Sequence, residues 1–164
     1  MKNAKTVIKK SKSKSKSKGP VRAKKTTVDG IIFDSRMESR YYTHLKYQKE
    51  IGAITNFVLQ PCFTLVPAYV KDGRKVQAIT YSPDYEITYP DGRVEYIDVK
   101  GRSTEVFKIK RKLFDYYYPD LKLLLVIETE PDVWEDYDTY KKRMALEKRR
   151  KTIAKKKALA EKNK

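Results

Sequence analysis

The segment YSPDYEITYPDGRVEYIDVKG, residues 81–101, decides the fold of this chain, because it contains two strand-like runs joined by a short turn. Its Pro90-Asp91-Gly92 triplet places proline at the second position of a type I turn and glycine at the left-handed position that ends a three-residue hairpin loop. Tyr89 then pairs with Arg93, and each residue faces the one whose number brings the sum to 182. This register predicts that Asp84 lies directly opposite Asp98.

Two opposed carboxylates need a compensating partner. Side chains that face each other across an antiparallel pair have Cβ atoms about 5 Å apart, and like charges placed there are destabilising. A divalent cation between the two acids, or a proton on one of them, would remove the repulsion. A two-residue loop would instead shift the register by one residue and turn Asp84 to the other face. Because Lys100 follows Asp98 by two residues, it lies on the same face.

The sequence therefore places two carboxylates and an ammonium at one end of a sheet. Asp84, Asp98 and the backbone carbonyl of Val99 could hold Mg²⁺, which polarises a phosphodiester and lowers the pKa of a bound water. Lys100 could orient or deprotonate that water, or offset charge on the phosphate in the transition state. In the alternative interpretation the aspartates are only solvated strand ends and Lys100 begins a loop, and the spacing alone leaves both open.

The remaining elements complete an α/β pattern. A helix is expected from Ser35 to Gly52, opened by a capping box between Ser35 and Glu38. Residues 63–70 and 75–82 predict a hairpin around a KDGR turn, whose second arm leads into the opening segment. A second helix runs from Thr104 to Pro119, and the apolar residues 121–128 predict a parallel strand reached by a right-handed crossover. The expected order is helix, three-stranded antiparallel meander, helix and parallel strand in one mixed sheet.

The charge of the chain is concentrated at its two ends. Of 38 Lys and Arg and 21 Asp and Glu, residues 1–25 contain 11 basic and no acidic side chains, and residues 139–164 contain 12 basic and two acidic ones. The middle, residues 26–138, keeps 15 basic and 19 acidic side chains, a net charge of −4. This predicts a disordered basic tail, a folded core over residues 26–138 and a basic C-terminal helix or tail. Basic flanks of this kind adsorb to polyanions, although they could also serve only solubility.

Several classes of protein are disfavoured by the composition. With Cys62 as the only cysteine and His44 as the only histidine, neither an internal disulfide nor a zinc site is expected. The basic N-terminus is not followed by an apolar run, and no segment approaches the length of a membrane span. We therefore expect a cytoplasmic protein without a membrane partner.

Five blocks of the sequence carry a resemblance to known nucleases. SPD at residues 82–84 and DVK at residues 98–100, preceded by a glutamate on an N-terminal helix, resemble the signature of the PD-(D/E)XK nuclease superfamily. In order, the blocks FDSRMESRYYTHL, Gln60-Pro61, YSPDYEI, IDVKG and FKIKRKLF resemble a small phage-encoded family catalogued as a domain of unknown function. The resemblance covers roughly residues 28–127 and excludes both basic ends.

The resemblance implies a restriction-endonuclease-like fold and a Mg²⁺-dependent endonuclease, a hydrolase of DNA in which Mn²⁺ could substitute. By position, Asp84 and Asp98 become metal ligands, Lys100 the catalytic lysine, and Glu38 the acid that completes the site, as a ligand directly or through water. Asp98 stands where many members have glutamate, which shortens the reach by one methylene. Phage DNA processing or recombination is the expected setting in a bacterial host cell, and phage Holliday-junction resolvases of the superfamily make branched DNA a candidate substrate.

Other roles stay open from the residues alone. Glu38 could act only as the capping partner of Ser35. Gln60 could contact the substrate or be an ordinary loop residue. A homodimer and other phage proteins are candidate partners, and a non-catalytic nucleic-acid-binding accessory protein on the nuclease fold is the alternative function. The second helix carries basic side chains that could bind DNA phosphates or form a solvated face: Lys108, Lys110, Arg111 and Lys112.

Overall fold

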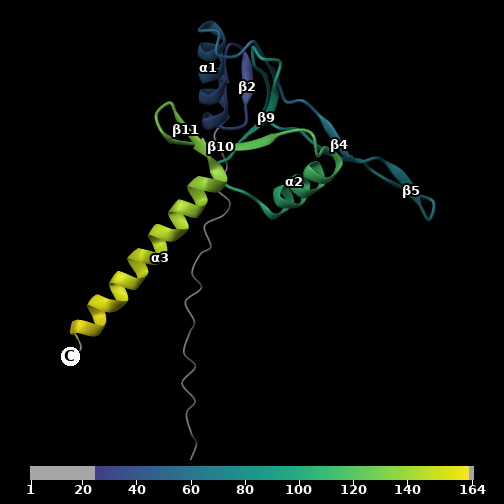
Figure 1. The fold of residues 1–164 in the computed structure, drawn as a ribbon. Helices are drawn as coiled ribbons and strands as arrows, with labels where there is room; N and C mark the ends of the chain where they lie inside the picture. Colours follow the sequence, from purple (N-terminus) through teal and green to yellow (C-terminus); the bar gives the residue numbers. More distant parts are fainter. Residues whose placement is uncertain (1–24, 163–164) are drawn as a thin grey trace, which may run out of the picture.

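The computed structural model describes residues 25–162 and has three helices and eleven strands in that part of the chain (Figure 1). In chain order they are β1 (Thr26–Val28), β2 (Ile31–Phe33), α1 (Arg36–Glu50), β3 (Asn56–Leu59), β4 (Phe63–Val66), β5 (Tyr69–Lys71), β6 (Arg74–Val76), β7 (Ile79–Tyr81), β8 (Tyr85–Thr88), β9 (Val94–Val99), α2 (Glu105–Tyr117), β10 (Leu123–Glu130), β11 (Val133–Asp136) and α3 (Tyr137–Lys162).

A mixed sheet of five strands forms the centre of the molecule, in the order β11-β10-β9-β8-β3. Strands β9 and β10 are parallel, as the strand, helix, strand pattern predicts, and the other neighbours are antiparallel. The α/β class and the parallel crossover through α2 are therefore confirmed.

The hairpin of β8 and β9 has the predicted register. Tyr85 pairs with Ile97 and Thr88 with Val94, so opposed residue numbers add to 182. The Tyr89 N–H donates to the Arg93 carbonyl at 2.9 Å and closes a three-residue loop. Gly92 ends that loop with φ of +82°, in the left-handed region where glycine carries no steric penalty.

The two helices that pack on the sheet begin at side-chain caps. The Ser35 hydroxyl accepts the N–H of Glu38 at the start of α1, and the Thr104 hydroxyl accepts the N–H of Phe107 at the start of α2. These bonds satisfy donors that the first turn of a helix leaves free. Helix α2 ends just before Pro119, which cannot continue it.

Alternation along the strands divides the core into two parts, one on each face of the sheet. On one face α1 packs on odd-numbered residues of the hairpin, with Leu45, Tyr85 and Ile97 all at most 2% exposed. On the other face α2 contributes Phe114, which is fully buried, against Tyr96 and Leu125. Even-numbered residues of β9 therefore face α2.

The predicted three-stranded meander is wrong in one respect. Residues 63–70 and 75–82 do pair with each other, but as two separate two-stranded sheets, β4 with β7 and β5 with β6. The strand beside β8 in the central sheet is β3, which the sequence pattern did not predict. Prolines, which cannot donate to a ladder, lie at both interruptions of the expected meander: Pro67 between β4 and β5, and Pro83 between β7 and β8.

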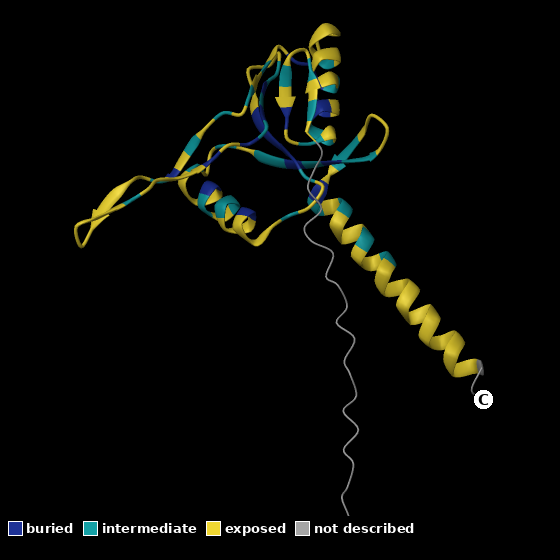
Figure 2. Cartoon of the chain, turned by 180° about the vertical axis from the view of Figure 1, so that it is seen from behind, coloured by how far each residue is buried: buried dark blue, intermediate teal, exposed yellow. Residues whose placement is uncertain are grey.

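Helix α3 leaves the body of the molecule and is exposed along most of its length (Figure 2). Its beginning is held in place, because Tyr137 is 3% exposed and the carboxylate of Asp136 accepts the N–H of Thr139. The basic C-terminal segment is thus helical up to Lys162, whereas the expectation for residues 1–25 lies almost wholly outside the described part of the chain. None of the helices within residues 25–162 combines the length and apolar character needed to cross a bilayer.

Candidate active site

Asp98 lies at the end of β9 on the face toward α2, and its carboxylate is almost completely buried. Its exposed fraction is 2%, and Oδ2 accepts a 2.5 Å hydrogen bond from the Tyr81 hydroxyl. Oδ1 lies 2.5 Å from Nζ of Lys100 and makes no hydrogen bond to another described residue. The Lys100 ammonium also lies 4.3 Å from the centre of the Phe107 ring, a cation–π contact. Asp98 and Lys100 are therefore fixed relative to each other and to α2.

Asp84 lies directly before β8, at the position that the hairpin register places opposite Asp98. Its Oδ2 accepts the backbone N–H of Val99 at 2.7 Å. The Tyr89–Arg93 bond makes odd-numbered pairs the hydrogen-bonded ones, so Val99 and Pro83 would form the next such pair. Because proline has no N–H, Pro83 cannot donate to the carbonyl of Val99. The carbonyl assigned to a metal by the sequence thus lacks its usual strand partner.

Electrostatic interactions connect the predicted residues. Burial, together with the negative charges of Asp98 and Glu38, raises the pKa of the Asp84 carboxyl to about 8. The hydrogen bond from Val99 and the positive charge of Lys100 act in the opposite direction without cancelling that effect. Burial also raises the pKa of the Tyr81 hydroxyl, with the charge of Asp98 adding to it, so this hydroxyl stays a hydrogen-bond donor.

Glu38 is a cap partner of Ser35 and also lies beside Asp84. As a cap partner, its backbone N–H donates to the Ser35 hydroxyl at 3.1 Å, and that hydroxyl donates to Oε1 at 2.8 Å. The side chain also shares a cavity of about 80 Å³ with Asp84 and Gln60. Burial raises the pKa of Glu38, the Ser35 hydrogen bond opposes this, and the charges of Asp34 and Asp98 reinforce it.

Gln60 lies beside the acidic residues, as its assignment requires. Its backbone N–H donates to the carbonyl of Asp84 at 3.0 Å, and its own φ is +47°. The side chain is exposed, so it can reach a ligand placed at the cavity.

Three of the four predicted phosphate-binding residues of α2 line one cleft, and the fourth does not. Lys108, Arg111 and Lys112 line a cleft of about 490 Å³ together with Lys141 from α3. Two of these charges are already paired: Lys108 with Glu105 and Arg111 with Asp138, each at 2.7 Å. Lys110 is half-buried and is not among the residues that line this cleft.

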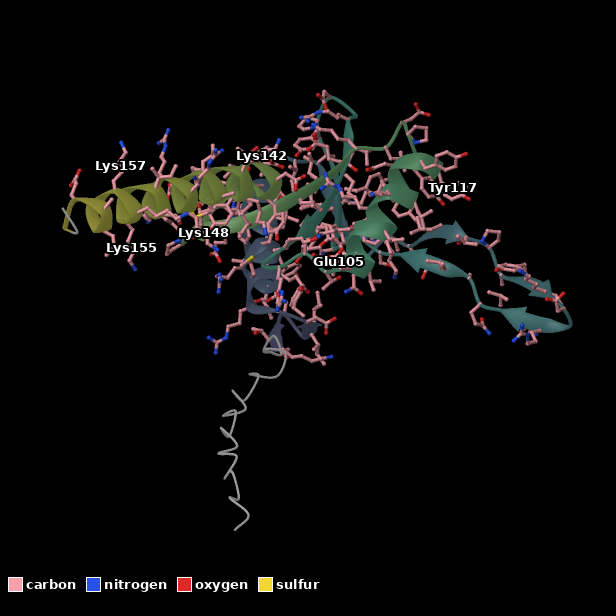
Figure 3. All side chains as sticks on the ribbon, turned by 90° about the horizontal axis from the view of Figure 1, so that it is seen from below. Glu105, Tyr117, Lys142, Lys148, Lys155 and Lys157 are labelled. Carbon is pink, nitrogen blue, oxygen red and sulfur yellow. The ribbon has the colours of Figure 1, made fainter. Side chains whose placement is uncertain are left out.

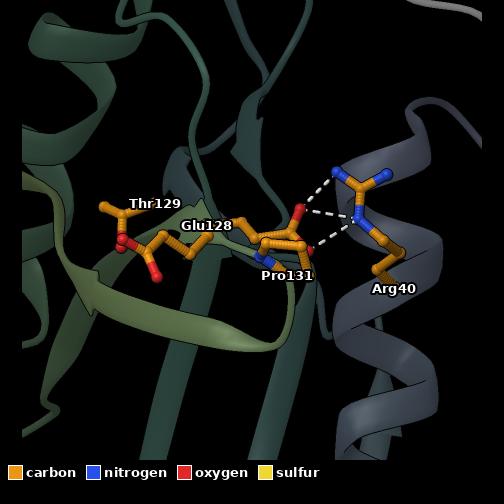
Figure 4. Close-up of a pocket in the computed structure, with 5 residues that line it drawn as sticks. Arg40, Glu128, Thr129 and Pro131 are labelled. Carbon is orange, nitrogen blue, oxygen red and sulfur yellow. Dashed lines mark hydrogen bonds and ion pairs between the residues drawn. The ribbon is translucent and has the colours of Figure 1, made fainter.

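An ion pair fixes α1 relative to the strand that borders the site (Figure 4). The Arg40 guanidinium binds both carboxylate oxygens of Glu128, with Nε at 2.8 Å and 2.6 Å from them and a further contact from Nη2. Arg40 follows Glu38 by two residues. Glu128 follows Val126 by two residues, and the carbonyl of Val126 accepts the N–H of Lys100. The pair therefore links α1, which carries Glu38, to β10, whose Val126 carbonyl accepts the N–H of Lys100.

Two residues of the site were not among the predicted ones. Tyr81 orients Asp98, and Phe107 supports Lys100 through its ring. Tyr81 stands three residues before Asp84 in the decisive segment, at the end of β7, which pairs with β4 and not with the central sheet. Phe107 lies on the inner face of α2, where an aromatic residue is expected for packing alone.

The donor chemistry of the site suits a hard divalent cation. Carboxylates and a backbone carbonyl are the ligands that Mg²⁺ prefers, and the pKa of Asp84 is raised first by burial and then by the negative charges of Asp98 and Glu38. Within residues 25–162, no three Asp, Glu, His or Cys side chains are already grouped in the arrangement of a metal site. The residues that would hold the ion are Asp84, Asp98 and the carbonyl of Val99, with Glu38 beside them.

The sequence was compared with curated proteins and with protein families. No curated protein matches the chain at a significant level. Residues 16–131 match the family described as "Protein of unknown function (DUF1064)". This match covers more than half of the 164 residues and includes every residue of the candidate site. The chain therefore belongs to the DUF1064 family.

Proposed function

We propose that this protein is a metal-dependent endonuclease that hydrolyses phosphodiester bonds of DNA on a restriction-endonuclease-like fold. One observation carries the proposal: the four residues expected together from the PD-(D/E)XK resemblance lie at one end of the sheet. Lys100 Nζ is 2.5 Å from Asp98 Oδ1, Asp84 accepts the N–H of Val99 next to Asp98, and Glu38 shares a cavity with Asp84. Salt bridges in a purely structural cluster lower the pKa of the acids, whereas here burial and the neighbouring acids raise the pKa of Asp84 to about 8.

Each residue has a distinct role in this proposal. A bound Mg²⁺ would supply Lewis-acid activation of the phosphate and of a water nucleophile. Asp84 and Asp98 provide carboxylate oxygens, and the Tyr81 hydroxyl keeps Asp98 in one orientation. Lys100 places its ammonium beside Asp98, where it can orient the water or offset charge on the phosphate. Glu38 contributes a further carboxylate at the cavity that it shares with Asp84.

The basic segments supply affinity for the polyanionic substrate. Helix α3 contains 11 Lys and Arg against three acidic residues among its 26 residues. Figure 3 shows Lys142, Lys148, Lys155 and Lys157 projecting from this helix into solvent. Their charges neutralise phosphates without reading sequence. The proposal therefore assigns binding to the flanks and chemistry to the acidic core, and places the protein in phage DNA processing, with branched DNA among the candidate substrates.

Cleavage by matched variants tests the proposal. Wild-type protein, Asp84→Asn and Lys100→Ala are incubated with Mg²⁺ or Mn²⁺ and a panel of supercoiled, linear duplex, flap, four-way and single-stranded DNA. We expect both variants to lose cleavage while retaining DNA binding, and the exposed controls Asp120→Asn and Lys49→Ala to cut normally. Undiminished cutting by either site variant would refute the assignment.

A second candidate function is favoured by one specific contact. Oδ1 of Asp98 is 2.5 Å from the Lys100 ammonium, so one candidate ligand oxygen already has a cationic partner. In a non-catalytic accessory protein, Asp98 and Lys100 would serve only to form this structural ion pair. If neither Mg²⁺ nor Mn²⁺ changes thermal stability or supports nicking of any substrate, the accessory role replaces the nuclease role.

A further inference from the structure

The hairpin of β5 and β6 extends away from the rest of the molecule (Figures 1 and 2). Its two strands pair only with each other, from Tyr69 with Val76 to Lys71 with Arg74. Asp72 and Gly73 form the turn at its tip, with φ of +50° and +75°. Positive φ at both central residues is the geometry of a two-residue turn that matches the twist of the strands. We call residues 68–78 the ribbon.

The ribbon has almost no support from the body. Tyr69 is 48% exposed and Val70 is 67% exposed, and only Val76 among residues 68–78 is half-buried. An isolated two-stranded hairpin is only marginally stable in water. A projecting hairpin of this kind is therefore suited to a role in which a partner covers it.

The charges of the ribbon indicate the chemistry of that partner. Lys71 and Arg74 are directly opposed, and Lys75 follows on the other face. Asp72 is the only acid within residues 68–78. Like charges in opposed positions of a hairpin repel each other, so the tip is most stable next to an anionic surface. This arrangement favours a polyanion over an apolar protein surface.

The ribbon is connected directly to the candidate active site. Its second strand leads into β7, which ends at Tyr81, the donor to Asp98. From Gly73 to Tyr81 there are eight residues, which span at most about 26 Å at about 3.3 Å per residue. This length corresponds to about eight base pairs at about 3.4 Å per base pair. The tip could therefore contact the same duplex whose backbone lies at the carboxylates.

We propose that the ribbon inserts into a groove of double-stranded DNA on one side of the bond that is cut. The proposal rests on the proposed function, because it takes DNA as the substrate. The major groove accommodates a two-stranded antiparallel ribbon. Lys71, Arg74 and Lys75 contact phosphates on the groove walls or base edges within it. The ribbon thereby gives the enzyme a preference for duplex over single strands.

Two triple variants with equal loss of charge test this inference. The first is Lys71→Ala/Arg74→Ala/Lys75→Ala in the ribbon, and the second is Lys155→Ala/Lys156→Ala/Lys157→Ala in α3. All six side chains are exposed, so neither variant disturbs the core. Binding to a duplex and to one of its strands is measured by fluorescence anisotropy over a range of salt concentrations, in EDTA to prevent cleavage.

We expect the ribbon variant to lose duplex affinity by at least about tenfold, with the salt slope reduced by about two to three, since each phosphate contact contributes about 0.9. Its affinity for the single strand should change little. The α3 variant should bind both the duplex and the single strand more weakly, to a similar extent. Unchanged duplex binding by the ribbon variant, or an equal loss for both ligands, would overturn the inference. The inference would also be overturned if, without DNA, light scattering showed the wild type to be a dimer and the ribbon variant to be a monomer.

The outcome is independent of catalysis. A wild-type protein that binds duplex through the ribbon but cuts nothing with Mg²⁺ or Mn²⁺ would reject the nuclease and keep the ribbon site. A wild-type protein that cuts, with a ribbon variant of unchanged duplex preference, would reject the ribbon site alone.

Discussion

Replacing Asp84 by asparagine should stabilise the metal-free protein at high pH. The carboxyl of Asp84 has an ordinary pKa of 3.8 and a folded-state pKa raised to about 8 by burial and by its acidic neighbours. Between these two values the folded state binds a proton that the unfolded state does not. Stability therefore falls as the pH rises from about 4 to about 8, because the unfolded carboxyl gives up its proton ever more readily while the folded carboxyl keeps it.

The magnitude follows from the size of that pKa difference. Each pH unit in this window removes about 1.4 kcal/mol, so the interval from about pH 5 to about pH 8 corresponds to about 4 kcal/mol at most. Part of the Asp84 side chain still reaches solvent, which screens the charge, and we therefore expect about half of this value, or about 2 kcal/mol. Asparagine can still accept the N–H of Val99 through its carbonyl oxygen, so the variant loses the charge and keeps the contact.

Urea unfolding at several pH values, in EDTA, measures this difference. The wild type should lose stability with rising pH relative to Asp84→Asn, while the exposed control Asp115→Asn should follow the wild type. Adding Mg²⁺ at about pH 8 should restore the wild type and leave Asp84→Asn unchanged, because metal binding favours the ionised carboxylate. Parallel curves for wild type and Asp84→Asn would show that the carboxyl is not destabilised by its neighbours, and the electrostatic argument for the site would fail.

Three further substitutions test individual contacts. Tyr81→Phe should lower the free energy of unfolding by about 1.5–3 kcal/mol, because it leaves a buried carboxylate oxygen of Asp98 without its donor; urea unfolding measures the loss, and cleavage should fall with it. Arg40→Ala should lower the free energy of unfolding by about 1–2 kcal/mol, since the Glu128 side chain is only 7% exposed while Arg40 is half exposed. An equal loss in Glu128→Gln, with no further loss in the double variant, would confirm the pairing. Gly92→Ala should destabilise by about 1 kcal/mol or more through its φ of +82°, measured as a lower melting temperature, and a neutral result would contradict the loop geometry.

Features set by a few neighbouring residues could be predicted from the sequence, whereas features set by contacts between distant segments could not. The loop Pro90-Asp91-Gly92 contains the information that fixes the β8–β9 register, and the caps Ser35 and Thr104 mark where their helices begin. Strand β3 has only four residues and is selected by its fit against β8, which a pattern within one segment does not contain. Phe107 belongs to the site only because the crossover brings α2 under Lys100.

Pro83 bears on two expectations from the sequence: the continuous meander, which was wrong, and the proximity of Asp84 to the end of β9. An uninterrupted strand through residues 75–88 would have satisfied the amide and carbonyl of Val99 by main-chain pairing and would have continued the meander. Proline at this position removes one donor, so β7 diverges from the sheet and carries the ribbon with it. The same interruption leaves the N–H of Val99 to the Asp84 carboxylate and turns Tyr81 toward Asp98. Pro83 thus separates the ribbon, which is proposed to bind DNA, from the central sheet. The same interruption leaves the carboxylate of Asp84 next to Val99, in the site proposed to cleave DNA.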